Sequence, residues 1–445
     1  MSLVDYIKNI NLIGLKKYSV NTTFLLFEKI IRLIAALFVG AYIARYLGPE
    51  NYGLLGYAQS LILVLMPILA IAHDSIIVKL LVRDTKHENR TIWSSFLLRI
   101  TGTVLLVISV NTIAAVTHTE SQLRMLILAF SLASISEAFY ALNSMFYAKV
   151  MTRYIFYSTF IALLISSIIK IILVHLQVSI EYFGWVYFLE TLVISIFLII
   201  FSFSRKFTIF PIRISRKTIT NIAKSSIPLL LSGFFVALYT QMDKVILNKL
   251  TNNEISGNYY AAVAIVGTFY FIPLSIVNSL FPAILTSAKF NRKLFFRQVQ
   301  SLYDIVIWLS IGTSIFLSLF SPFISRILYG GKYTDTPYLL SIYSFCGIFV
   351  SIGLVNSSVL VAEGLQKYIL FSTALGAVIS LVANVILVPL FGSLASVLVA
   401  LLSGFVTTML SMAVFGTTTR QYFFLQIKSL NIIHAVKRGL SLFKY

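Results

Sequence analysis

Residues 28–53 read EKIIRLIAALFVGAYIARYLGPENYG, an apolar run with charged residues at its start and a Gly-Pro pair near its end. A helix over this run is long enough to cross the ~30 Å hydrocarbon core of a membrane. Gly48 and Pro49 then predict a turn, because glycine adopts positive φ readily and proline disrupts a helix interior. The stretch therefore predicts a membrane-spanning helix that turns tightly into the next one.

Apolar blocks of similar length recur through the 445-residue chain, which is 58% hydrophobic and 11% charged. Soluble domains usually carry about 25% charged residues. The pattern therefore predicts an all-α integral membrane protein with about twelve transmembrane helices. We expect the spans at 21–45, 53–73, 93–117, 122–147, 154–176, 181–203, 226–250, 257–287, 303–328, 337–362, 367–390 and 392–415.

The net charge of +20 is distributed as the positive-inside rule requires, with Lys and Arg gathered in cytoplasmic loops. If the N-terminus lies inside, 25 of the 35 Lys and Arg residues fall in inner segments, 5 in outer loops and 5 within spans. This bias predicts that both ends of the chain face the cytoplasm. It also accounts for the charge without a nucleic-acid partner.

The connecting loops are short, and none is long enough for a soluble catalytic domain of about 50 residues. The longest loop divides the chain into six spans and six spans. We therefore expect an N-terminal amphipathic cytoplasmic segment (1–20), a first six-helix lobe (21–203), a basic cytoplasmic linker (204–225), a second six-helix lobe (226–415) and a basic amphipathic cytoplasmic tail (416–445).

The two predicted lobes begin alike, which indicates an internal repeat. The first begins ALFVGAYIARYLGPENYGLLGYAQ and the second FFVALYTQMDKVILNKLTNNEISGNYYAA. Six spans separate the copies, so both have the same orientation, and parallel repeats of this kind build transporters with a site between the halves. We expect two parallel six-helix pseudo-repeats around a central cavity. The aligned pairs are Leu47 with Leu250, Glu50 with Glu254, Gly53 with Gly257 and Ala58 with Ala262.

Several ionisable residues fall inside predicted spans, where they are costly and usually face a polar interior. Glu28, Lys29 and Arg32 share one arc of the first span, and Glu28 and Arg32 are spaced to pair. We interpret the cations as a cavity for an anionic substrate and the carboxylates as ion-coupling or structural groups; the alternative is internal ion pairs that lock the bundle. The candidates are Lys29, Arg32, Arg99 and Lys170 for substrate binding, and Glu28, Glu137 and Asp243 as carboxylates.

Motifs of catalysis are missing from the sequence, which has no GxxxxGK[ST], GxSxG or HExxH. The single Cys346 excludes an intrachain disulfide, and the five His residues lack metal-ligand spacing. The sequence therefore predicts a membrane transporter and not an enzyme, with no cofactor and no metal.

The opening motif resembles that of polysaccharide flippases of the Wzx type, in the multidrug/oligosaccharidyl-lipid/polysaccharide exporter superfamily. The resemblance covers nearly the whole chain and departs at SLASVLVALLSG (393–404), where the family usually has a Gly-Ala-Ala run. The matching residues are Glu28, Lys29, Arg32, Ala44, Arg45, Tyr46, Leu47, Gly48, Pro49, Glu50, Tyr52 and Gly53. Later landmarks are Asp243, GNYYAA (257–262), LYGGKY (328–333), Gly364, Asn384, Pro389 and Gly392.

This resemblance implies a multi-pass flippase of the bacterial cytoplasmic (inner) membrane. Its substrate would be an undecaprenyl-pyrophosphate-linked oligosaccharide repeat unit for lipopolysaccharide O-antigen, capsule or exopolysaccharide. Alternating access would move the unit across the membrane, with coupling to an ion gradient as a further hypothesis. The implied partners are this lipid-linked oligosaccharide, anionic membrane lipids, and polymerase and chain-length proteins of the same pathway.

Other functions remain open at this point. A drug or cation antiporter of the same superfamily would have the same fold but a more acidic cavity. A lipid II flippase resembles a fourteen-span design, and the charged tail here disfavours two more spans. A membrane-embedded polysaccharide polymerase or ligase would be expected to carry a long periplasmic loop, and the predicted topology has none.

Overall fold

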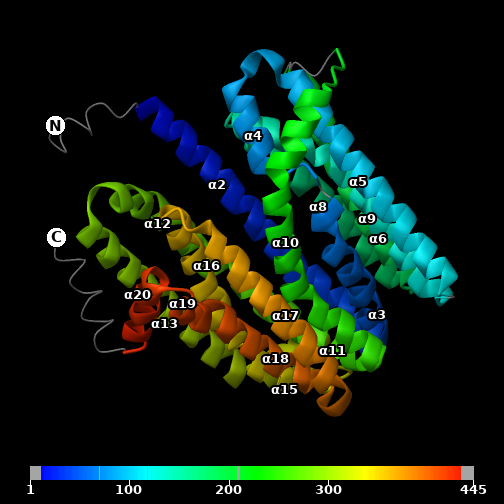
Figure 1. The fold of residues 1–445 in the computed structure, drawn as a ribbon. Helices are drawn as coiled ribbons and strands as arrows, with labels where there is room; N and C mark the ends of the chain where they lie inside the picture. The colour runs from blue at the N-terminus through cyan, green and yellow to red at the C-terminus, as the bar shows by residue number, and fades with distance from the viewer. Residues whose placement is uncertain (1–11, 70, 118, 206, 208–210, 432–445) are drawn as a thin grey trace. The chain divides into compact units, whose positions relative to one another are not determined.

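The structure, a computed structural model, describes residues 12–69, 71–117, 119–205, 207 and 211–431 (Figure 1). Residues 1–11 of the predicted N-terminal segment and residues 432–445 of the predicted tail lie outside the described residues. Of residues 12–20 only the backbone is described. Within the described ranges the secondary structure is helical, with no strand. The predicted all-α fold class is confirmed.

Ten helical stretches among the described residues are long and apolar enough to cross a membrane. In chain order, these ten stretches overlap the third to the twelfth predicted span, one stretch for each span. The first two predicted spans lie in α2 (Leu12–Ile34), the π-helix η1 (Ala35–Val39) and α3 (Gly40–Leu69). Gly48, at φ 72°, interrupts α3 as the Gly-Pro pair predicts. The chain is a multi-pass membrane protein.

Contacts between Cα atoms divide the chain into two compact units. Unit 1 contains the chain up to Ala35 and Leu65–Leu231; unit 2 contains Ala36–Val64 and Ser232–Tyr445. Residues 36–64, which come from the first two predicted spans, thus make most of their contacts with unit 2. The lobe limits expected from the sequence, 21–203 and 226–415, stay a prediction.

Each boundary between the units falls inside a helix, close to an irregularity of that helix. The first lies at the start of η1, and the second lies in α3, just before Pro67. The third lies in α10 (Arg216–Leu250), three residues after Pro228. Proline removes a backbone hydrogen bond and a π-helix loosens the ladder, so these are the places where a long helix bends most readily.

Unit 1 is a bundle in which α6 (Ser121–Glu137) packs on α9 (Glu181–Ser204), α8 (Arg153–His175) on α9, α5 (Glu88–Val116) on α6 and α2 on α8 (Figure 1). Its interior includes the fully buried Leu106, Leu126, Phe146 and Leu198. Its remaining helices are α4 (Asp74–Arg83), η2 (Thr85–His87), η3 (Ala138–Tyr140), α7 (Ala141–Ala148), the end of α3 and the first part of α10.

Unit 2 has an interior rich in buried tyrosines, among them Tyr259, Tyr303 and Tyr333. Together with η1, most of α3 and the rest of α10, its helices are α11 (Asn253–Phe269), α12 (Phe271–Phe290), α13 (Arg292–Leu319), α14 (Ser321–Tyr329), α15 (Thr336–Tyr343), α16 (Cys346–Ala362), α17 (Gln366–Phe391), α18 (Ser393–Phe405), η4 (Val406–Leu410), α19 (Ser411–Val414) and α20 (Thr417–Ser429).

One predicted boundary differs from the structure. The span predicted at 303–328 begins earlier, at Arg292, and ends at Leu319; Pro322 lies in the first turn of the separate helix α14. The basic residues at the start of α13 made this helical segment look like a loop in the sequence.

In the predicted tail, α20 buries Thr419, Tyr422, Gln426 and Ser429 against the rest of unit 2. The amphipathic and cytoplasmic character of the tail stays a prediction.

Candidate functional site

The end of α2 carries the predicted charged arc. Glu28 and Arg32 form an ion pair one turn apart, and Arg32 Nη2 also donates to Thr159 Oγ1 of α8 over 3.4 Å. Asn21 ties the same two helices together, because its Oδ1 accepts from the Thr152 amide at 2.8 Å. Arg32 is still 43% exposed in its side chain, whereas Glu28 is 14% exposed. The guanidinium is therefore positioned by its partners and remains accessible.

Lys29 lies beside this pair and differs from the other predicted cations. Its side chain is exposed, and no ion pair or hydrogen bond to it is found among the described residues. An exposed, unpaired ammonium keeps its charge available for an anion. Lys29 and Arg32 thus form an accessible pair of cations on α2.

Glu137 closes α6 at the point where the helix changes to the 3₁₀ turn η3. Its carboxyl interacts electrostatically with Arg32 and Arg99, and with the hydroxyls of Tyr140 and Tyr187. A 3₁₀ segment inside a long helix often marks a hinge or a strained position. The predicted face of this span therefore contains a carboxylate near two arginines, at an irregular point of the backbone.

Lys170 on α8 has a partner that the sequence pattern did not identify. Its Nζ donates to Glu190 Oε2 of α9 at 3.0 Å, and Ser166 Oγ donates to the same oxygen at 2.7 Å. Glu190 is 8% exposed, so this is an internal ion pair between neighbouring helices. The spacing of residues in the sequence could not show that Lys170 faces Glu190, because the two lie on different helices.

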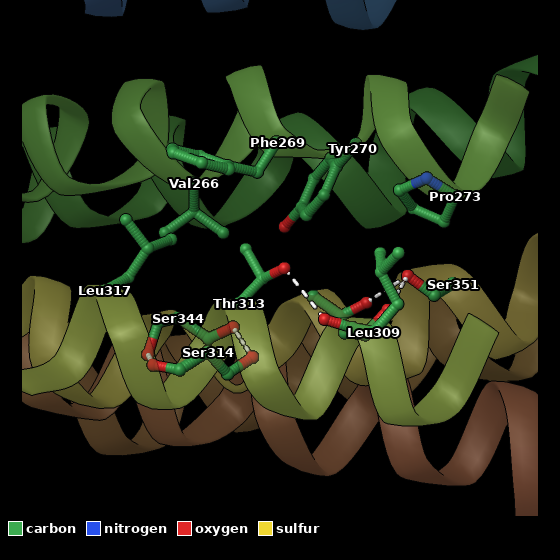
Figure 2. Close-up of a pocket in the computed structure, with 12 residues that line it drawn as sticks. Val266, Phe269, Tyr270, Pro273, Leu309, Thr313, Ser314, Leu317, Ser344 and Ser351 are labelled. Atoms are coloured by element: carbon green, nitrogen blue, oxygen red, sulfur yellow. Dashed lines mark hydrogen bonds between the residues drawn. The ribbon is translucent and has the colours of Figure 1, made fainter. Parts of the chain in front are cut away.

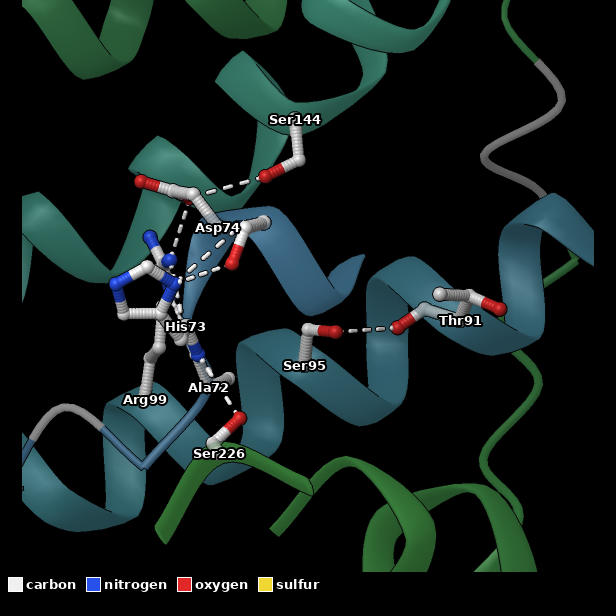
Figure 3. A network of polar contacts seen from close by, with 9 residues as sticks. Ala72, His73, Asp74, Thr91, Ser95, Arg99, Ser144 and Ser226 are labelled. Atoms are coloured by element: carbon white, nitrogen blue, oxygen red, sulfur yellow. Dashed lines mark hydrogen bonds and ion pairs between the residues drawn. The ribbon is translucent and has the colours of Figure 1, made fainter. Parts of the chain in front are cut away.

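Arg99 on α5 is 8% exposed and holds the turn between α3 and α4 (Figure 3). Its Nε and Nη2 donate to the carbonyl oxygen of Ala72 at 3.0 and 2.7 Å, and Nη2 donates to Asp74 Oδ1 at 2.6 Å. Ser144 Oγ donates to the same Asp74 oxygen at 2.9 Å. Here Arg99 stabilises a turn, and its role in substrate binding stays a prediction.

In unit 2 the predicted Asp243 is 6% exposed on α10. Tyr259 of α11 donates a hydrogen bond to Asp243 Oδ2, while Oδ1 is buried without a hydrogen-bond partner. Lys244 follows it in sequence, and its Nζ donates to Gln241 Oε1 at 2.9 Å. A buried carboxylate oxygen without a partner is costly. Asp243 is therefore a candidate for binding a proton or a cation.

A small cavity in unit 2 does not qualify as a substrate site. It encloses about 20 Å³ between α11, α12, α13 and the segment Ser344–Ser351, which is space for about one water molecule (Figure 2). At its edge Ser310 Oγ donates a hydrogen bond to Ser351 Oγ at 2.7 Å. The serine hydroxyls around the cavity hydrogen-bond neighbouring helices to one another, so we interpret the cavity as a feature of helix packing.

The chain has similarities to known proteins that agree with this fold. A family model described as "Polysaccharide biosynthesis protein" matches residues 19–288. No curated protein matches the chain. A solved structure described as lipid II flippase MurJ in an inward closed conformation is 14% identical with a TM-score of 0.69, over 93% of this chain and 90% of that one.

Two further structures come from transporters. An outward-facing multidrug resistance MATE family transporter of the MOP superfamily is 13% identical with a TM-score of 0.62, over 94% of this chain and 96% of that one. A MOP superfamily transporter from Pyrococcus furiosus, described as having a binding pocket of reversed polarity, is 12% identical with a TM-score of 0.56, over 90% and 97%. At such identities these likenesses establish the fold.

Proposed function

The chain belongs to the polysaccharide biosynthesis protein family, and on that premise we propose that it is a flippase for an undecaprenyl-pyrophosphate-linked oligosaccharide repeat unit. The unit would serve O-antigen, capsule or exopolysaccharide synthesis in the bacterial cytoplasmic membrane, with both chain ends inside. Polymerase and chain-length proteins of that pathway would act on the exported unit. The chain itself would carry out no bond chemistry.

The observation that carries this proposal is the accessible pair of cations at the end of α2. A pyrophosphate is a dianion or more at neutral pH, and Lys29 and Arg32 offer an ammonium and a guanidinium one turn apart. Glu28 holds Arg32 in position, so a phosphate would share or replace an existing ion pair. The lipid tail of such a substrate needs no polar site, because it stays in the bilayer.

Alternating access requires bending within long helices, and the unit boundaries support it. The boundaries lie at the π-helix η1, at Pro67 and near Pro228. Helices with such interruptions bend with little loss of backbone hydrogen bonding, since part of the ladder is already missing. We propose rocking about these positions as the transport motion.

Coupling to an ion gradient would use a carboxylate that is buried in one state and exchanges its ion in another. Asp243 fits this role, because one of its oxygens is buried without a partner. Glu28 and Glu137 remain further candidates, since both interact with Arg32. The proposed function does not depend on which of the three is used.

Depletion of the protein in its native cell tests the proposal. We expect lipid-linked single repeat units to accumulate on the cytoplasmic leaflet, and the intact gene to restore export. Arg32→Ala should fail to restore export while reaching the membrane at the normal level. If the units instead reach the periplasmic side and stay unpolymerised, the protein is a polymerase and the flippase proposal fails.

A further inference from the structure

Helices α12 and α13 enclose a groove of about 360 Å³ on the surface of unit 2. Its lining comes from one face of each helix, spaced three or four residues apart, as expected for antiparallel neighbours joined at Asn291. Most of the surface is apolar, and its exposed side chains include Leu280, Leu294 and Ile305. The lining includes neither Asp243 nor any residue of α2.

One cation lies in this groove. The Arg297 side chain is exposed, and no acidic partner for its guanidinium is found within the described parts of the chain. By contrast Arg292, one and a half turns earlier, is paired with Glu363. Gln298 lies beside Arg297, with its Oε1 accepting from Ser287 at 2.6 Å, and its amide NH₂ has no hydrogen-bond acceptor among the described residues. Arg297 and Gln298 thus direct free donors into an apolar groove.

These donors lie near the basic end of α13, which is where a lipid phosphate would meet a membrane-spanning helix. Arg297 lies about 8 Å along the helix from Arg292, and Lys289 and Lys293 flank the turn at this end. From Arg297 to Ile305 the groove extends about 12 Å along α13, which is less than half of a ~30 Å hydrocarbon core. The groove therefore fits within one leaflet, on the side that the charge distribution assigns to the cytoplasm.

We infer that this groove binds an anionic phospholipid of the inner leaflet, with the phosphate on Arg297 and Gln298 and an acyl chain along Leu280, Ala283 and Ile305. Basic pockets between membrane helices on the cytoplasmic side are known to take anionic headgroups. A single guanidinium suits a phosphodiester, whereas a pyrophosphate would call for a second cation at the same depth. The lipid bound here is accordingly a resident lipid and not the transported substrate.

The test measures lipid binding to the purified full chain, with phosphatidylglycerol as the probe and phosphatidylcholine as the zwitterionic comparison. We expect phosphatidylglycerol to raise the melting temperature and to be retained in native mass spectra. Arg297→Gln should weaken its binding about fivefold, the factor expected for one basic residue near an anionic headgroup. Lys293→Gln is the matched control, because it removes the same charge from the same helix outside the groove. Equal losses in the two variants would show that charge alone attracts the lipid and would overturn the inference.

A second pair of variants tests the acyl chain. Ala283→Phe extends a ring into the groove and should weaken phosphatidylglycerol binding, while Leu285→Phe, on an exposed part of α12 that does not line the groove, should leave it unchanged. Both can be checked for folding by their melting temperature without added lipid. If Arg297→Gln leaves phosphatidylglycerol binding intact but removes binding of the lipid-linked oligosaccharide, the groove belongs to the substrate and the inference is wrong. These readouts do not require transport, so they stand or fall separately from the proposed function.

Discussion

Gly53 and Gly257 occupy equivalent positions in the two copies of the internal repeat, and each packs against the other copy's helix start. A Cβ on Gly53 would lie 1.9 Å from the carbonyl oxygen of Asn253, and a Cβ on Gly257 would lie 1.8 Å from that of Pro49. Pro49 and Asn253 are themselves equivalent in the repeat. The contact is therefore reciprocal, as in an isologous two-fold interface. It lies wholly within unit 2.

Gly53→Ala and Gly257→Ala should each destabilise the protein, because the methyl group would overlap backbone atoms that cannot rotate away. We expect a loss of about 1–3 kcal/mol or more, as for other overpacked sites. Gly267→Ala is the matched control, since Gly267 is also in α11 and a Cβ there meets no atom within 4 Å. It should be neutral or slightly stabilising. Melting temperatures in detergent would check this, and equal values for all three variants would contradict the close contact.

The motif at residues 44–53 shows how far the sequence could predict this fold. Hydropathy and the Gly-Pro turn predict the helices, because span length and turn chemistry are local properties. The motif's contacts are not local: Tyr333 donates to the carbonyl oxygen of Ala44 at 2.6 Å from a loop almost 300 residues away. Burial raises the pKa of Tyr333, so its hydroxyl stays a donor. A contact of this kind depends on packing between distant helices and leaves no spacing signal.

For the charged residues too, local contacts could be predicted from the sequence and contacts between helices could not. Glu28 and Arg32 could be paired from their four-residue spacing, because helix geometry alone brings them together. The partners of Lys170 and Arg99 lie on other helices, so only the packing of α9 and the turn at Ala72 identifies them. Tyr187 of α9, which interacts with Glu137, was missed for that reason. Aromatic residues are so frequent in this chain that no single tyrosine is distinctive in the sequence.

Mutation can distinguish the role of Arg32 in transport from that of Glu28. If Arg32 binds the substrate and Glu28 only positions it, Arg32→Ala should lower transport about 10- to 100-fold, the effect of losing a charged hydrogen bond. Glu28→Gln should keep most activity, because Arg32 remains charged and accessible. Arg32→Lys should be intermediate, since an ammonium cannot make the bidentate contact of a guanidinium. Transport assays at matched protein levels would decide, and equal losses from Glu28→Gln and Arg32→Ala would mean that the pair only locks the bundle.

Arg99→Gln should act mainly on stability. The change removes donors from the Ala72 carbonyl oxygen and weakens the contact with Asp74, and we expect a loss of about 1–3 kcal/mol. The exposed Arg124 provides a control of equal charge, and Arg124→Gln should stay within about 0.5 kcal/mol. Thermal unfolding measures both. Full stability of Arg99→Gln together with lost transport would instead support the sequence-based assignment of Arg99 to the substrate.

Helix α20 should be required for the stability of unit 2. Gln426 is fully buried, and its Nε2 donates to Asn356 Oδ1 at 2.8 Å. Gln426→Ala would leave that oxygen with fewer donors, so we expect a loss of about 1–3 kcal/mol. The neighbouring Ile427, which is 43% exposed, is the control, and Ile427→Ala should have a much smaller effect. Similar melting temperatures for the two variants would mean that α20 lies loosely on the surface.

Asp243→Asn should separate ion coupling from folding. The amide oxygen of the asparagine can still accept the hydrogen bond from Tyr259, so the fold should persist. The negative charge of the carboxylate, whose Oδ1 has no hydrogen-bond partner, is lost. We expect transport in proteoliposomes to continue down the substrate gradient and to stop responding to an imposed proton or sodium gradient. Tyr259→Phe is the complementary variant, because it removes the hydrogen bond and keeps the carboxylate, and it should retain the gradient response. A gradient response that survives in Asp243→Asn would exclude Asp243 as the coupling group and leave Glu28 and Glu137 to be tested in the same way.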